Sequence, residues 1–119
     1  MPPYFDLLAW QKAHRLVIRI YSLTKGWPSD ERFGLTSQVR RAAVSIPTNV
    51  AEGAARRGKK EFRRFLDIAA GSHAEVAYLL RLAIDLGYLN GGEIESLLTD
   101  CDEVGRLIWG LHRRMRTPS

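Results

Sequence analysis

The sequence has a single cysteine, and this scarcity excludes two classes of small protein. With only Cys101 among 119 residues, the chain has neither an internal disulfide framework nor a cysteine-rich zinc module. No window approaches about 18 uninterrupted apolar residues, so we expect no membrane association through a spanning segment. The first residues also lack the basic segment and apolar run of a signal peptide. We therefore expect a soluble, cytoplasmic protein.

Catalytic patterns are equally scarce. The three histidines, His14, His73 and His112, fall in three different predicted helices, and the last two lie within apolar arcs, as is typical of core histidines. The segment Gly58-Lys59-Lys60 lacks the glycine spacing and the following Ser/Thr of a phosphate-binding loop. No Glu-x-x-His pair that could hold a di-iron centre is present. We predict no catalytic residues, no metal site, no cofactor, no small-molecule substrate and a non-enzymatic role.

The composition that is present suits one globular domain. Hydrophobic residues make up 45% of the chain and charged residues 26%, which excludes a disordered or low-complexity protein. A chain of this size buries roughly two-thirds of the surface that its unfolded form exposes, so it can build a core without staples. We predict a single domain over residues 1–119.

Four segments show the 3.6-residue apolar period of a helix, and none shows the alternation of a strand. They predict helices over about residues 5–25, 35–55, 59–86 and 90–115. Pro47 falls inside the second segment, where it removes one donor and crowds the carbonyl of Ala43, so we expect a kink rather than a break. Because the connections are short, we predict an all-α fold, an antiparallel up-and-down four-helix bundle.

The third predicted helix is more apolar than a simple bundle requires. Its apolar side chains spread over about 160° of the helical wheel, whereas one buried face needs somewhat over 100°. Scattered exposed leucines are one explanation and a subunit interface is the other, since contiguous apolar patches usually mark association. We predict a homo-oligomer and expect Leu79, at the far edge of the arc, to lie at its interface.

A polar stripe on the second predicted helix points to the same contact. It runs beside the core face and has small apolar residues on its other side. The stripe consists of Gln38, Arg41, Ser45, Asn49 and Glu52. Such a stripe is expected of a hydrogen-bonded seam between subunits, and plain exposure to solvent is the alternative.

Positive charge is concentrated at the junction between the second and third predicted helices. Residues 40–64 carry eight basic side chains against two acidic ones, a net charge of +6, whereas the other 94 residues sum to −1. Lys59 and Lys60 fall in the first turn of a helix, where the helix dipole disfavours cations. We predict a phosphate-binding surface without sequence readout, and a solvated charged corner is the alternative. The predicted surface consists of Arg56, Arg57, Lys59, Lys60, Arg63 and Arg64.

Residues 40–53, Arg-Arg-Ala-Ala-Val-Ser-Ile-Pro-Thr-Asn-Val-Ala-Glu-Gly, resemble the signature of four-helix-bundle proteins encoded in intervening sequences of bacterial 23S ribosomal RNA genes. Residues 31–38, 65–72 and 86–88 resemble the same family. The resemblance implies an antiparallel bundle that assembles into a ring-like homopentamer. Similar proteins include the accessory protein of diversity-generating retroelements, whose basic barrel is associated with nucleic acid. On this basis we assign the predicted seam to the motif residues Arg41, Ser45, Pro47, Asn49, Glu52 and Gly53.

Two functions remain open at this point. The first is an oligomer, a pentamer by the resemblance, that binds nucleic acid through the basic junction and favours RNA by family association. The second is a scaffold or adaptor whose basic surface docks an acidic protein or the chain's own acidic stretch. That stretch runs from Asp85 to Glu103 and has six acids and no base. Strong salt dependence of RNA binding would favour the first.

Overall fold

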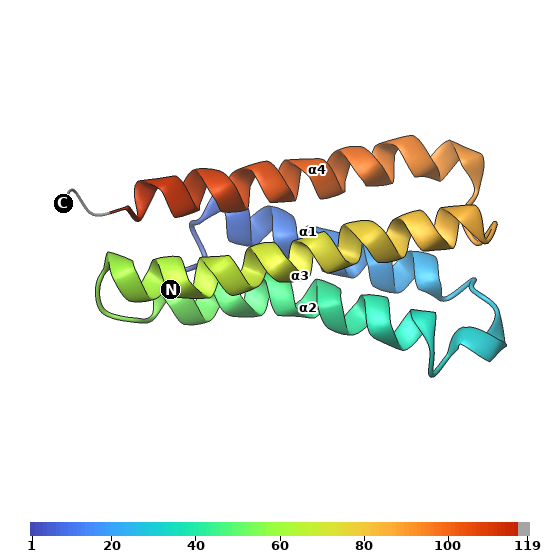
Figure 1. Cartoon of the computed structure of the whole chain (residues 1–119), viewed down its shortest axis with the longest axis horizontal. Coiled ribbons are helices and arrows are strands. Elements are labelled where there is room, and N and C mark those ends of the chain that lie inside the picture. Colours follow the sequence, from blue (N-terminus) through green and yellow to red (C-terminus); the bar gives the residue numbers. More distant parts are fainter. Residues whose placement is uncertain (117–119) are drawn as a thin grey trace.

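The structure is a computed structural model that describes residues 1–116, and four α-helices make up most of this part of the chain (Figure 1). They are α1 (Leu8–Thr24), α2 (Leu35–Ala54), α3 (Lys59–Asp85) and α4 (Gly91–Arg114), with a 3-10 turn, η1 (Ser29–Glu31), before α2. Residues 1–116 contain no strand. The prediction of an all-α fold with four helices is confirmed. Residues 117–119 of the predicted domain lie outside the described residues.

The helices begin and end where local chemistry allows. Residues 2–7 form tight turns, in which the Leu7 amide donates to the Tyr4 carbonyl at 2.9 Å, so α1 begins later than the predicted start at about residue 5. Gly87 ends α3 in the left-handed conformation, with a φ of +80°, and the Tyr88 amide then reaches the Ala83 carbonyl at 3.0 Å. The side chain of Asn90 caps α4 by accepting from the Gly92 amide at 3.0 Å.

The helix α2 continues through Pro47. Pro47 is buried, and the turn that contains it gains a side-chain bond, because the Thr48 hydroxyl donates to the Val44 carbonyl at 2.7 Å. The helix therefore does not break at the proline, and the kink stays a prediction.

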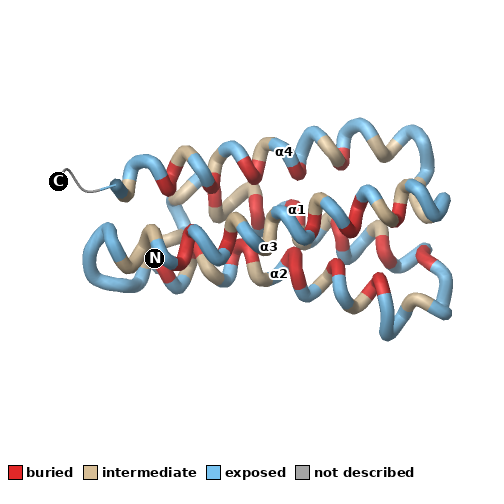
Figure 2. The backbone as a smooth tube through the Cα atoms, viewed as in Figure 1, coloured by how far each residue is buried: buried red, intermediate tan, exposed pale blue. Residues whose placement is uncertain are grey.

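The core is closed because each helix packs against two others. The helix α3 contacts α2 and α4, and α1 contacts the same two helices from the other side. Buried positions consequently form a stripe along the inner side of every helix (Figure 2). A helix with two neighbours needs a wide apolar arc, which accounts for most of the width of the arc on α3.

The expectation that Leu79 lies at a subunit interface is wrong. Its exposed fraction is 2%, and it belongs to the core of the bundle. A helical wheel shows how wide an apolar arc is but not which neighbours cover each edge. The large apolar side chains of α3 that do remain exposed are Ile68 and Tyr78, together with Leu86 at its C-terminal cap.

The connections place opposite charges at opposite ends of an elongated molecule of 48 × 25 × 24 Å. The junction between α2 and α3 lies at the same end as the C-terminal end of α4, and the α3–α4 connection lies at the other end (Figure 1). The acidic stretch from Asp85 to Glu103 begins at that other end.

Across residues 1–116 we find no helix with the length and hydrophobicity that spanning a membrane would require.

Candidate nucleic-acid interface

The basic junction is a tight turn that leaves its cations in solvent. The chain leaves α2 at Ala54 and enters α3 at Lys59. Gly58 takes a φ of +85°, a conformation that side chains disfavour, so glycine is needed for the turn to close. The four cations around this turn, Arg56, Arg57, Lys59 and Lys60, are all exposed.

Two arginines of the junction are held by neighbours within the chain. The guanidinium groups of Arg56 and Arg64 lie over the Phe65 ring, 5.1 and 5.0 Å from its centroid. Arg64 also forms an ion pair with Glu61 at 3.2 Å, and this hydrogen-bonded guanidinium holds the pKa of Glu61 below its ordinary value. Arg64 is therefore the member of the predicted surface that is least available to a ligand.

The rest of the junction is not neutralised by the chain. Within residues 1–116, the ion pairs of the structure leave Arg57, Lys59, Lys60 and Arg63 without an acidic partner. Arg63 is half-buried, whereas the other three are exposed. Unneutralised cations beside the free amides of a helix start form a surface that can hold phosphate oxygens.

Sequence reasoning missed three further cations at the same end of the molecule. Arg113 and Arg114 are the last residues of α4, Arg116 comes two residues later, and all three are exposed. The last turn of α4 is fixed beside α3, because Nε2 of His112 lies 2.8 Å from a carboxylate oxygen of Asp67. The signal was present in the helix lengths: the fourth predicted helix is nearly as long as the third, so its end returns to the start of the third.

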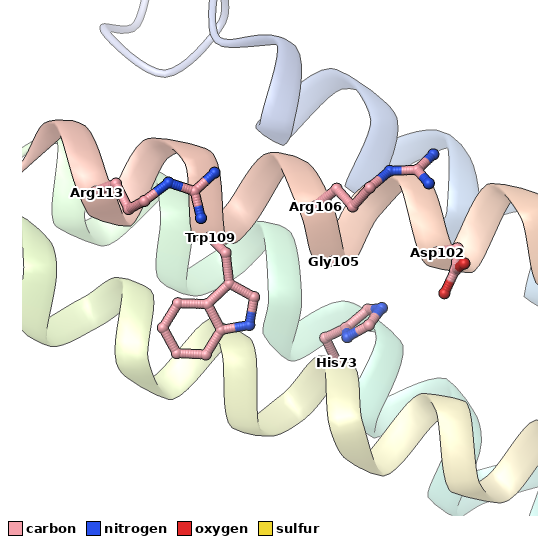
Figure 3. A pocket seen from close by; sticks show the side chains of 6 residues that line it. All are labelled: His73, Asp102, Gly105, Arg106, Trp109 and Arg113. Atoms are coloured by element: carbon pink, nitrogen blue, oxygen red, sulfur yellow. The ribbon is translucent and has the colours of Figure 1, made fainter.

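A groove of about 460 Å³ lies between α3 and α4 (Figure 3). It is lined by His73, Asp102, Gly105, Arg106, Trp109 and Arg113. The His73 ring takes the space of a side chain at position 105, since a Cβ added to Gly105 would come within 2.5 Å of its Cε1 atom. Nε2 of His73 lies 2.7 Å from the Cys101 carbonyl oxygen, which can only accept, so this nitrogen carries the proton.

The cysteine and histidine side chains near this groove that could act as nucleophile or base, Cys101 and His112, are part of the packed interior. Cys101 is buried between the helices, and burial raises the pKa of its thiol to about 11, which keeps it in the unreactive protonated form. His112 is buried and paired with Asp67. Within residues 1–116 no group of three or more potential ligands could hold a metal ion.

The predicted seam residues divide into two groups. Four of them have intramolecular roles: Ser45 shares a hydrogen bond with Ser72 at 2.7 Å, Asn49 donates to the Ser45 carbonyl at 2.8 Å, and Pro47 and Gly53 are buried. Arg41 and Glu52 are exposed. Arg41 borders a hollow of about 350 Å³ that Gln38, Ala42, Ser45, Ser72 and Glu75 also line. The role of the stripe between subunits stays a prediction.

Comparison with known proteins identifies a family and finds solved structures with a similar fold. The model of a family described as 23S rRNA-intervening sequence protein matches residues 5–110. The fold is similar to the crystal structure of a protein of unknown function from the S23 ribosomal protein family of Bacteroides thetaiotaomicron VPI-5482, with a TM-score of 0.81 and 25% sequence identity. The similarity covers 89% of this chain and 96% of that one. No curated protein matches the chain.

Proposed function

The chain belongs to the 23S rRNA-intervening sequence protein family, and we propose its function from the charges and contacts of its own surface. It is a non-enzymatic, oligomeric four-helix bundle that binds nucleic acid, RNA by preference, through phosphates. The binding surface is the basic end, which consists of Arg56, Arg57, Lys59, Lys60, Arg63 and Arg64 with Arg113 and Arg114 of α4 and Arg116 just after it. The basic end does not read base sequence.

One observation carries this proposal: two lysines of the basic end lie where their charge destabilises the helix and no acid of the described chain offsets it. Lys59 and Lys60 occupy the first turn of α3, where each opposes the helix dipole at a cost of about 0.3–1 kcal/mol. Neither is paired with an acid within residues 1–116. A phosphate ligand would relieve both the repulsion and the unsatisfied amides of that turn.

Assembly into a ring-like homopentamer is the second part of the proposal. It is supported by exposed apolar side chains on two sides of the bundle, Leu8 and Ile18 on α1 and Ile68 and Tyr78 on α3. The antiparallel up-and-down order belongs to the same proposal and is supported by connections that alternate between the two ends in Figure 1. A ring presents the basic end once per subunit, so one long strand can bind several basic ends at once and its affinity exceeds that of a single contact.

The adaptor alternative is less well supported by the acidic stretch. Two of its six acids are already paired across the α1–α4 contact, Asp100 with Arg19 at 2.6 Å and Glu103 with Lys12 at 3.5 Å. Those carboxylates are less available to the basic end of another copy or to another basic partner. If the protein does not bind nucleic acid, the adaptor function is the one that is supported.

Reversing the charge of the turn tests the proposal. We expect the parent to bind unrelated RNA sequences with similar affinity and to lose that affinity steeply as salt rises, because phosphate contacts release counterions. The combined change Arg56→Glu, Arg57→Glu, Lys59→Glu and Lys60→Glu should abolish binding in a fluorescence-anisotropy titration. Circular dichroism and light scattering should show unchanged helix content and oligomer mass.

A matched variant separates local charge from net charge. Replacing Arg15, Lys25, Arg32 and Arg81 by glutamate makes the same change in net charge at exposed positions outside the basic end, and this variant should keep most of the affinity. If the junction variant binds as well as the parent, or if the parent does not bind at low salt, the nucleic-acid function is wrong. A parent mass near 13.5 kDa at micromolar concentration would contradict the oligomer.

A further inference from the structure

An exposed indole and two cations share one side of α4. Trp109 has an exposed fraction of 47%. Arg106 lies three residues before it and Arg113 four residues after it, so the three side chains are neighbours on the helix surface. Figure 3 shows the arginines along α4 on either side of Trp109, while the indole reaches toward α3. Neither arginine forms an ion pair with another residue of the described part of the chain.

The indole is held in place by its neighbours. The ring of Trp109 meets the ring of His112 edge to face, with centroids 5.0 Å apart. His112 is in turn fixed to α3 by its 2.8 Å contact with Asp67. An aromatic ring that is ordered before binding loses little conformational freedom when a flat ligand stacks on it.

The groove also offers a polar group beside this ring. Because Nε2 of His73 donates to the Cys101 carbonyl, Nδ1 is the ring nitrogen left for a ligand, and it accepts a hydrogen bond when the ring is neutral. Gly105 allows the His73 ring to lie against α4 at this point. The groove therefore combines a ring on which a base can stack, a hydrogen-bond acceptor for that base, and two flanking cations for its phosphates.

We infer that this groove holds an unpaired base of a single-stranded nucleic acid, stacked on Trp109, with the adjoining phosphates on Arg106 and Arg113. The inference rests on the proposed function and deepens it by naming the form of the strand. The two arginines lie about 10.5 Å apart along the helix axis, one on each side of the indole. A duplex does not meet this requirement, because its bases are stacked on one another.

The charges of the groove also give the strand a direction. Asp102 lies beyond Arg106 at this end of the groove, so its carboxylate repels a strand that would continue past Arg106. Arg113 lies at the other end and is followed by Arg114 and Arg116 of the basic end. The strand therefore leaves the groove past Arg113 toward the α2–α3 junction, which joins the stacking site to the phosphate-binding surface.

Strands with and without bases test the inference. The probes are fluorescently labelled oligothymidylate, oligouridylate and an abasic DNA strand with the same number of phosphates. We expect the parent to bind the two base-containing strands more tightly than the abasic strand. Trp109→Ala should lower the affinity for base-containing strands by about 5- to 150-fold, the range for loss of one stacked base, and should leave abasic binding unchanged. Trp109→Phe should retain most of the affinity.

Phe33→Ala is the matched control. Phe33 is an exposed aromatic residue, and the Arg32 guanidinium lies over its ring at 5.3 Å. Phe33 precedes α2 and does not line the groove. This variant should bind every strand like the parent. Equal parental affinity for base-containing and abasic strands, or an equal loss in Phe33→Ala, overturns the stacking site but leaves the proposed function standing. A fall in oligomer mass of Trp109→Ala overturns it as well, because the groove is then a subunit contact. If no strand binds at low salt, the proposed function fails with it.

Discussion

Replacing Leu79 by glutamate is expected to unfold the bundle rather than to dissociate an assembly. Leu79 has an exposed fraction of 2% and belongs to the shared core. Loss of a buried leucine side chain costs about 2–5 kcal/mol, and an unpaired buried carboxylate adds several kcal/mol more. Their sum approaches the total stability of a typical domain, about 5–15 kcal/mol. Circular dichroism should show the loss of most helical signal or a large fall in Tm.

The neighbouring residue provides the control for this prediction. Tyr78 has an exposed fraction of 62%, so Tyr78→Glu should change the free energy of unfolding by about 0.5 kcal/mol or less. If the exposed side of α3 contacts a second copy, Tyr78→Glu should lower the oligomer mass while the helix content stays the same. Should Leu79→Glu instead keep the parental Tm and become monomeric, the packing described for α3 is wrong.

Gly53→Ala is expected to destabilise the bundle although alanine is the better helix former. A Cβ at position 53 would lie 2.8 Å from a ring atom of Phe62 and 2.9 Å from Cβ of Phe65. The Phe65 Cβ cannot move without its backbone, so α2 and α3 must separate. Overpacking of this kind costs about 1–3 kcal/mol, and Gly53→Val should cost more. Urea unfolding followed by circular dichroism measures the change.

Gly71→Ala is the matched substitution on the partner helix. Gly71 is exposed in the middle of α3, and a Cβ there would meet nothing within 4 Å. The change should therefore stabilise the protein by about 0.5–1 kcal/mol, the difference in helix propensity. If both glycine variants gain stability, close approach of α2 to α3 is not the reason for glycine at position 53.

The sequence predicted the helices well because their signals are local. Asn90 and Gly87 mark helix ends through bonds to residues a few positions away, and such bonds depend little on the rest of the fold. The start of α1 was placed too early because the turns of residues 2–7 carry apolar side chains that fit the helical period. The core position of Leu79 could not be read from one helix, since it depends on which two helices cover α3.

Only part of the candidate site could be predicted from the sequence, because local signals are readable there and contacts between distant segments are not. The turn from Arg56 to Lys60 is contiguous in the chain, so its charge stood out without a structure. Arg113 and Trp109 come from α4 and approach α3 only after the last connection is made, as the His112–Asp67 contact shows. Only the packed structure shows that Arg64 is engaged by Glu61 and thus less available than its neighbours.

The buried thiol of Cys101 reports on motions of the bundle. With its pKa raised to about 11 and its side chain buried between α3 and α4, the packed state offers alkylating reagents almost no thiolate. Modification at neutral pH must then pass through molecules in which α4 has separated locally from α3. The alkylation rate of the native protein is consequently a kinetic measure of that separation, and a ligand clamped across the α3–α4 groove would slow it.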